Sequence, residues 1–309
     1  MSKNPPFLRR LWSALPFVKD SRPLVTVLEL SGVIGVSSGL GDRGLSHAKV
    51  EKVIAAAFQP KDLSAVALAI NSPGGSPVQS HLIMRAIRRA AEKAKVPVLA
   101  FIEDAGASGG YMLALAGDEI YADEASIVGS IGVISAGFGF TTAIDRLGIE
   151  RRVYTAGESK SQLDPFRPEN DADIAKLDTI LTEMHAHFIG LVKERRGTAL
   201  NDAFDDLFTG AFWTAGPAHE RGLIDGIGRL DEFLQTRFGE TVRIKRIFRR
   251  STPFRRLFGA RRALSPMPGQ IMGASDEPLV DLAGGLADGL ADGVFSALEE
   301  RAFWARIGL

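Results

Sequence analysis

The sequence contains no cysteine among its 309 residues. This absence excludes disulfide bonds, zinc sites built on thiolates and a cysteine nucleophile. It does not identify the redox compartment, because proteins of every compartment can do without cysteine.

Long hydrophobic runs and a net charge are also missing. No run approaches the roughly 18–20 apolar residues that a membrane-spanning helix needs. The short apolar stretch 11–18 is interrupted by Pro16 and precedes no small-residue cleavage site. We therefore expect a cytoplasmic protein, soluble or peripheral at the membrane. Lysine plus arginine equals aspartate plus glutamate at 37 each, so the net charge indicates no partner.

Strands and helices alternate from Pro23 onward. Short apolar runs bounded by turn residues predict strands, and apolar residues at helical spacing predict helices. The expected strands are Leu24–Leu30, Ala65–Ile70 and Val96–Ile102, and the expected helices are Leu45–Phe58, 78–90 and 171–196. This alternation predicts an α/β fold, with a parallel sheet covered by helices.

The composition divides the chain into three parts. We expect a mobile lead over 1–22, a catalytic domain over 23–240 and an appendage over 241–309. Residues 241–262 hold nine basic residues and no acidic one. We expect the stretch 243–262 either to contact an anionic membrane or to be a solvated extension. Nucleic acid is not the expected partner, because no recognised module accompanies the charge. Regularly spaced leucines over 279–298 are typical of an oligomerisation helix, but several glycines weaken an isolated helix, so we expect this tail either to pair with a partner or to stay disordered.

One serine lies in a glycine-rich turn between a predicted strand and a predicted helix. The turn reads Gly106-Ala107-Ser108-Gly109-Gly110. Such a turn can present a hydroxyl at the carboxyl edge of a sheet, and the following helix start offers backbone N–H groups to an oxyanion. Ser108 is therefore the candidate nucleophile, against the alternative of a turn without chemistry.

A serine nucleophile needs a base, and the sequence leaves two types open. Histidine in the order serine, acid, histidine would be His219 with Asp205 or Asp206. A lysine serves only when it is neutral, and since its free pKa is about 10.4 it must be sheltered. The lysine candidate is Lys160, in the loop Gly157-Glu158-Ser159-Lys160-Ser161.

Several segments in order resemble the signal peptide peptidase A family, whose members share the Clp protease/crotonase-like fold. The resemblance spans roughly residues 24–235. The matching segments are Leu30–Gly35, Asn71–Gly75, Ala107–Tyr111, Gly129–Val133, the Lys160 loop and Gly210–Gly228.

The resemblance implies a serine endopeptidase with a Ser/Lys dyad and no metal or cofactor. Ser108 would be the nucleophile and Lys160 the general base. The backbone N–H groups of Gly75 and Gly109 would form the oxyanion hole, and Ser130 would support the lysine. The substrate would be a short or unfolded peptide, including signal-peptide remnants and membrane-associated polypeptides, and the protein would form a homo-oligomeric ring.

Three functions follow from this sequence. The first is the Ser/Lys endopeptidase, the second is a hydrolase that pairs serine with histidine, and the third is a non-catalytic scaffold at a membrane. The presence of Ser108, Ser130, Lys160 and the Gly74-Gly75 turn favours the first.

Overall fold

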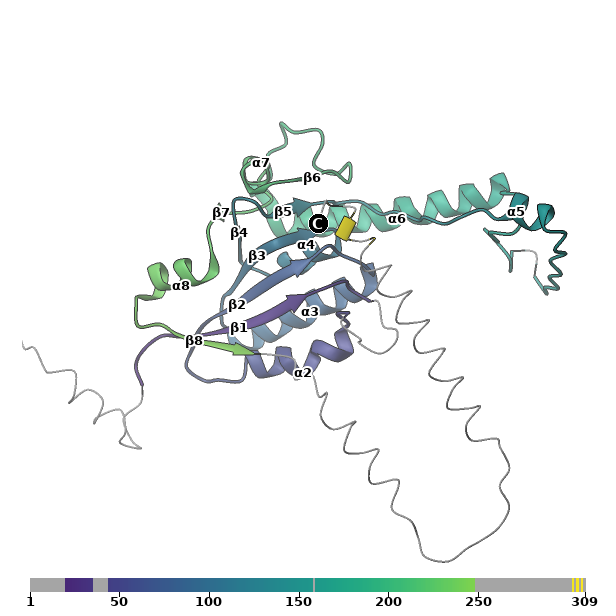
Figure 1. The fold of residues 1–309 in the computed structure, drawn as a ribbon. Coiled ribbons are helices and arrows are strands. Elements are labelled where there is room, and N and C mark those ends of the chain that lie inside the picture. Colours follow the sequence, from purple (N-terminus) through teal and green to yellow (C-terminus); the bar gives the residue numbers. More distant parts are fainter. Residues whose placement is uncertain are drawn as a thin grey trace, which may run out of the picture.

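The computed structural model describes residues 20–35, 44–157 and 159–247, together with Ala302, Trp304, Ala305 and Ile307. These residues form an α/β body from which a long arm extends (Figure 1). The predictions made above for residues 1–19, for 249–262 and for the tail 279–298 concern residues outside the described ranges.

The body is built on one sheet of eight strands, most of them parallel. The main path runs β6-β5-β3-β2-β1-β8, while β4 pairs with β3 and β7 pairs with β4. Only the β5–β6 pair is antiparallel among the described strands. The strands are β1 (Leu24–Ser31), β2 (Leu63–Ser72), β3 (Val98–Ala107), β4 (Glu119–Ala122), β5 (Ile127–Gly129), β6 (Phe212–Trp213), β7 (Gly226–Ile227) and β8 (Arg243–Ile247).

Helices cover both faces of the sheet because the central strands are apolar on both sides. Along β1, Leu28 and Leu30 belong to one buried cluster and Val25 and Val27 to another, as the alternation of a strand requires. The first cluster packs against α2 (His47–Ala57), α3 (Pro77–Ala94), α4 (Gly109–Ala114), the C-terminal part of α6 (Asp171–Arg196) and α7 (Ala215–Glu220). The second packs against α8 (Leu230–Phe238). This arrangement confirms the predicted α/β fold, with a mostly parallel sheet covered by helices.

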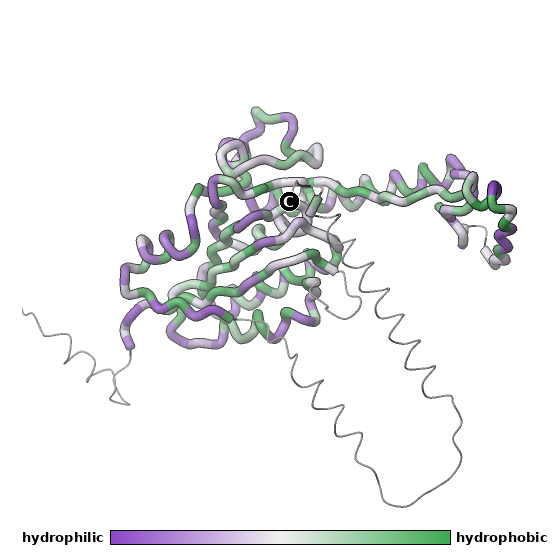
Figure 2. Tube along the Cα trace, in the orientation of Figure 1, coloured by the Kyte–Doolittle hydropathy of each residue, from purple (hydrophilic) through white to green (hydrophobic). Residues whose placement is uncertain are grey.

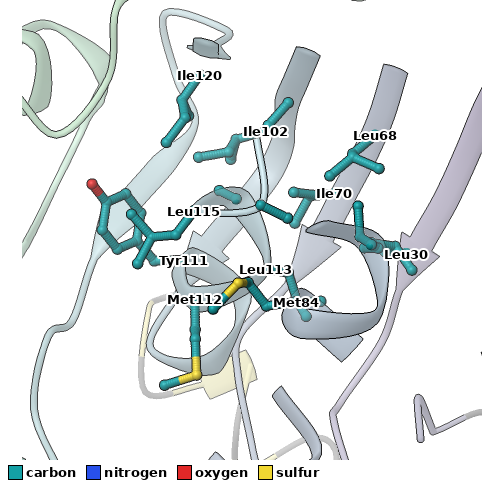
Figure 3. Close-up of a cluster of buried hydrophobic side chains, with 14 of the residues drawn as sticks. Leu30, Leu68, Ile70, Met84, Ile102, Tyr111, Met112, Leu113, Leu115 and Ile120 are labelled. Carbon is teal, nitrogen blue, oxygen red and sulfur yellow. The ribbon is translucent and has the colours of Figure 1, made fainter. Parts of the chain in front are cut away.

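Helix α4 lies at the centre of the larger cluster. Every residue of α4 is buried, and Tyr111 and Leu113 are fully so. They belong to one buried cluster with Leu30 of β1, Ile70 of β2 and Ile102 of β3 (Figure 3). The phenol of Tyr111 donates a hydrogen bond to the Leu223 carbonyl at 2.7 Å. The helix that follows Ser108 is therefore held in a packed interior.

The arm comprises residues 137–176 and contains α5 (Thr141–Arg146) and the first turns of α6 (Figure 1). No residue of the arm that the structure describes is buried. Apolar positions nevertheless recur along it (green in Figure 2), including Phe138 at 80% exposure and Tyr154 at 91%. Residues 150–155 of the arm form no strand.

The sheet continues past the boundary expected at residue 240. Strand β8 pairs in parallel with β1, with Leu24 opposite Arg243 and Leu28 opposite Ile247. Its basic side chains form ion pairs with acids of the body. Arg243 contacts Asp62 at 2.6 Å, and Arg246 contacts Glu29 at 3.3 Å. The residues 243–247 are thus an edge strand of the body, and the first part of the basic segment is paired within the chain.

Candidate active site

Ser108 lies at the junction between β3 and α4, with a backbone that few non-glycine residues adopt. Its φ is +53° and its ψ is −120°. The Ser108 N–H donates to the Gly129 carbonyl at 2.8 Å, and the Ser108 carbonyl accepts from the Met112 N–H at 3.0 Å. A strained serine that is fixed on both sides is characteristic of a nucleophile turn.

The glycine turn after β2 lies directly against this serine. A side chain at Gly74 would meet Cβ of Ser108 at 2.8 Å, and one at Gly75 would meet the Ile34 carbonyl oxygen at 2.1 Å. The turn is held there because the Ile34 N–H donates to the Gly74 carbonyl at 2.8 Å and the Ser76 N–H donates to the Ile34 carbonyl at 2.7 Å. Only glycine fits this approach of two backbones.

Two backbone N–H groups beside Ser108 have no acceptor within the described part of the chain, those of Gly75 and Gly109. Gly109 is the first residue of α4, where a helix has no internal partner for its N–H. Two such donors next to a nucleophile are what a developing oxyanion requires. The structure places these two glycines and Ser108 at one cavity.

Ser130 is also brought to this site. It follows β5, has a φ of +53°, and donates its N–H to the Ala211 carbonyl at 2.7 Å. Ser108, Ser130, Gly75 and Gly109 all line one cavity of about 970 Å³.

The walls of this cavity are mainly apolar. They come from α3, α4, α6 and the segments 132–136 and 209–212. The apolar side chains are those of Pro73, Pro77, Val78, Leu82, Met112, Val133, Ile134, Ala136, Leu177, Ile180, Leu181, Met184, Phe188, Phe212 and Ile307. A pocket of this kind suits an extended peptide with hydrophobic side chains.

Two histidines lie on the same wall, and sequence reasoning did not assign them to the site. The rings of His81 on α3 and His187 on α6 meet edge to face, with centroids 5.1 Å apart. Burial, and then the neighbouring His187 and Arg85, lower the pKa of His81. His81 lies three residues after Val78, which also lines the cavity, and this helical spacing is the one signal in the sequence that points to this face.

The histidine that the sequence offered as an alternative base lies elsewhere. His219 is in α7 and is not among the described residues that line the cavity. Asp206 forms an ion pair with Arg221 at 2.6 Å, and this hydrogen bond lowers the pKa of the carboxyl. The arrangement does not bring Ser108, His219 and Asp206 together.

Lys160 lies in the arm, and among the described residues it is not one that lines the cavity. Its side chain is exposed, and its N–H donates to the Gly157 carbonyl at 3.2 Å. The surrounding loop is ordered by a small cluster. Phe140 stacks on Phe166 at 5.4 Å, and Arg151 lies over Phe166 while contacting Asp164 at 3.0 Å. The arm, which carries Lys160 in the segment between α5 and α6, extends away from the body that holds Ser108 (Figure 1).

Neither a metal cluster nor a membrane span is found in the described ranges. No group of three or more metal-binding side chains is close enough there to hold an ion. None of the helices in those ranges combines the length and the apolarity needed to cross a bilayer.

Comparison with known proteins finds a peptidase family model and several proteases similar to this chain. Residues 90–241, which include Ser108, Ser130 and Lys160, match the model of "Peptidase family S49". The chloroplastic serine protease SPPA of Arabidopsis thaliana is 31% identical over 206 residues, which are 65% of this chain and 29% of that protein. Protease 4 of Haemophilus influenzae is 26% identical over 211 residues, which are 67% of this chain and 33% of that protein.

Two further proteins are similar to this chain. A Brucella abortus protein named "Na(+)/H(+) antiporter NhaA" is 46% identical over 285 residues, which are 92% of this chain and 37% of that protein. The chain thus spans only about a third of the length of these three relatives. A mutant of the 1510-N membrane-bound stomatin-specific protease superposes with a TM-score of 0.45 and 16% identity, over 74% of this chain and 98% of that one. The family match and the protease relatives support the resemblance of this chain to the SppA-like proteins of peptidase family S49.

Proposed function

We propose that this chain is a serine endopeptidase in which Ser108 attacks the peptide bond and Lys160 of a second copy acts as general base. The observation that carries this proposal is the geometry around Ser108. The serine has a left-handed backbone, two N–H groups without acceptors in the described chain lie beside it, and an apolar cavity opens from it.

The chemical steps follow from these groups. A neutral lysine takes the proton from the Ser108 hydroxyl as its oxygen attacks the substrate carbonyl carbon. The negative charge that forms on the carbonyl oxygen accepts hydrogen bonds from the N–H groups of Gly75 and Gly109. The protonated lysine then gives its proton to the leaving amine, and an ester on Ser108 remains. Water attacks this ester with the lysine again as base, which releases the acid and restores the serine.

The assignment of the base to a second copy rests on the position of the arm. Within one chain, Lys160 would reach Ser108 only if the arm folded back over the body. A neighbouring copy meets the same need without such a change, and the exposed apolar residues of the arm, such as Phe138 and Ile149, supply a contact surface. Desolvation in such a contact favours the neutral form of a lysine. We therefore propose a homo-oligomer, in the form of a ring, with one dyad for each pair of neighbouring copies.

The substrate class follows from the cavity. Its walls accept hydrophobic side chains in an extended backbone, and a closed ring admits short or unfolded peptides more readily than folded proteins. Remnants of signal peptides and membrane-associated polypeptides fit this description.

The test is cleavage of an unstructured hydrophobic peptide by wild type, Ser108→Ala and Lys160→Ala from about pH 6 to 10. The proposal expects both variants to lose activity and wild type to be most active at alkaline pH. Activity retained in Lys160→Ala would refute the lysine as base.

A serine–histidine hydrolase is the second candidate, and the observation that favours it is that His81 and His187 share the Ser108 cavity. The matched variants are His81→Gln and His187→Gln. Loss of activity in either one, with Lys160→Ala still active, would select this candidate. If the protein is a non-catalytic scaffold, it binds the peptide, and neither wild type nor any of these variants cleaves it.

We also propose that the basic stretch contacts an anionic membrane surface, now through residues 249–262 alone. Ion pairs within the body engage Arg243 and Arg246 of β8. Sedimentation with anionic liposomes tests this when the paired arginines at 249–250, 255–256 and 261–262 are replaced by glutamine, which leaves β8 intact. Equal pelleting of wild type and this variant would reject the contact.

A further inference from the structure

Four described residues near the end of the sequence lie against the body beside the candidate site (yellow in Figure 1). They are Ala302, Trp304, Ala305 and Ile307. Ile307 is only 6% exposed and forms a buried cluster with Ala105 and Ala107 of β3. Trp304 and Ile127 of β5 pack against the same cluster. The two strands contacted here are those that lead to Ser108 and Ser130.

The segment presents one face to the body and the other to solvent. Ile307 donates its N–H to the Trp304 carbonyl at 3.1 Å, so the two residues lie one helical turn apart. Residues three apart on a helix share a face. Trp304 and Ile307 face the body, whereas Ala302 and Ala305, also three apart, are exposed. The contact therefore depends on two specific side chains.

Ile307 reaches the cavity that contains the nucleophile. It lines this cavity together with Ser108, Gly109 and Met112. Figure 3 draws the segment as a pale yellow ribbon near Met112. Ile307 thus packs on Ala105 and Ala107 of β3 and also lines the cavity in which a hydrophobic peptide would bind.

We propose that segment 302–307 competes with the substrate from within the chain, with Ile307 seated in a subsite next to Ser108. The proposal rests on the proposed function, because it takes the cavity to be the peptide site. A tethered segment competes at a high effective concentration, and only the fraction of molecules in which it is displaced binds peptide. The segment thereby raises the apparent KM and leaves kcat unchanged.

The first test compares two aspartate substitutions in the full chain. Ile307→Asp places a charge in the apolar subsite and releases the segment, whereas Ala305→Asp places the same charge on the exposed face of the same turn. If about a tenth of the wild-type molecules are open, Ile307→Asp lowers the apparent KM for an unstructured hydrophobic peptide about tenfold with kcat unchanged. Ala305→Asp retains the wild-type values.

A second test works without catalysis and so separates this proposal from the proposed function. In a Ser108→Ala background, fluorescence anisotropy measures the Kd of a fluorescein-labelled hydrophobic peptide. Ile307→Asp tightens binding by the same factor as it lowers KM, and Ala305→Asp does not. The tryptophan emission assigned to residue 304, by difference from Trp304→Phe, shifts to the red in Ile307→Asp alone.

The outcomes divide cleanly. An unchanged or raised KM in Ile307→Asp, with the enzyme active, would make Ile307 a wall of the pocket and overturn the competition while the peptidase assignment stands. If every protein is catalytically inert, anisotropy and emission decide: tighter binding with a red shift supports the competing segment, and no difference between the two aspartate variants rejects it.

Discussion

The body and the arm of this molecule place opposite demands on the same chain. The body holds Ser108 at the start of α4, whose six residues are all buried, and the arm holds Lys160 in a segment where no described residue is buried. A nucleophile has to be fixed against its oxyanion donors, so it belongs in a packed interior. A base supplied by another copy has to extend from the body of that copy to reach the nucleophile. In the proposed dyad, therefore, folding of the chain positions Ser108, whereas assembly of the copies positions Lys160.

The largest effect is expected from a substitution in the glycine turn beside Ser108. Gly75→Ala would push its Cβ against the Ile34 carbonyl and displace an oxyanion donor, so kcat falls by about 10²-fold or more. Gly137→Ala in the arm is the control, because a side chain there meets no atom within 4 Å. Peptide hydrolysis measures both, and equal activities would refute the role of the Gly75 turn.

The next prediction concerns stability. Leu113 is fully buried in α4, so Leu113→Ala lowers the free energy of unfolding by about 3 kcal/mol. Tyr154, which is 91% exposed in the arm, changes it by less than about 0.5 kcal/mol when replaced by alanine. Urea denaturation measures both variants. A comparable loss in Tyr154→Ala would show that the arm contributes to the stability of the body.

A pH-dependent contact ties the C-terminal end of α6 to the body. Arg196 makes two hydrogen bonds to Asp225, each 2.9 Å long, and Asp225 also accepts from the Ile120 N–H at 2.7 Å. Burial raises the pKa of Asp225, but the hydrogen bonds from Arg196 and Ile120 outweigh it, so the pKa is lowered overall.

A carboxyl whose pKa is lowered by folding stabilises the fold above its unfolded pKa, and this contribution is lost as the pH falls through the folded pKa. Asp225→Asn therefore costs about 2 kcal/mol at pH 7. The gap between wild type and the variant narrows below about pH 4. Unfolding free energies from pH 7 to 3 measure it, and a gap that is constant with pH would contradict this account.

The smallest effect is expected from a substitution in the arm, which is the proposed contact between copies. Phe138→Asp puts a charge on the exposed apolar surface of the arm and weakens assembly, so activity at low protein concentration falls about tenfold. Ile227→Asp, at a body residue that is 48% exposed, is the control. Sedimentation velocity and the concentration dependence of activity report the result. Unaltered assembly in Phe138→Asp would exclude this surface as the contact.

Sequence patterns predicted the body better than the arm. Periodicity identified the strands around Leu28 and Leu68 and the helix α6, and the glycine-rich motif identified the turn at Ser108. Periodicity reports that a residue is apolar and not what covers it, so the exposure of Phe138 and Tyr154 was not foreseeable.

Two further features depend on contacts between distant segments. In the sequence, strand β8 is seen only as a run of basic residues. The carboxylates that pair with it, such as Asp62 and Glu29, come from distant parts of the chain. His81 and His187 meet only after α3 and α6 are packed together. Local patterns carry no record of such pairs.

The most direct test of the account is complementation between two inactive proteins. Ser108→Ala retains Lys160, and Lys160→Ala retains Ser108. They are mixed in equal amounts under conditions in which native mass spectrometry confirms that subunits exchange. If the dyad forms between copies, about a quarter of the sites in random mixed oligomers hold both groups, and the mixture regains about a quarter of wild-type activity. A mixture no more active than either parent, with exchange confirmed, would contradict a dyad shared between copies.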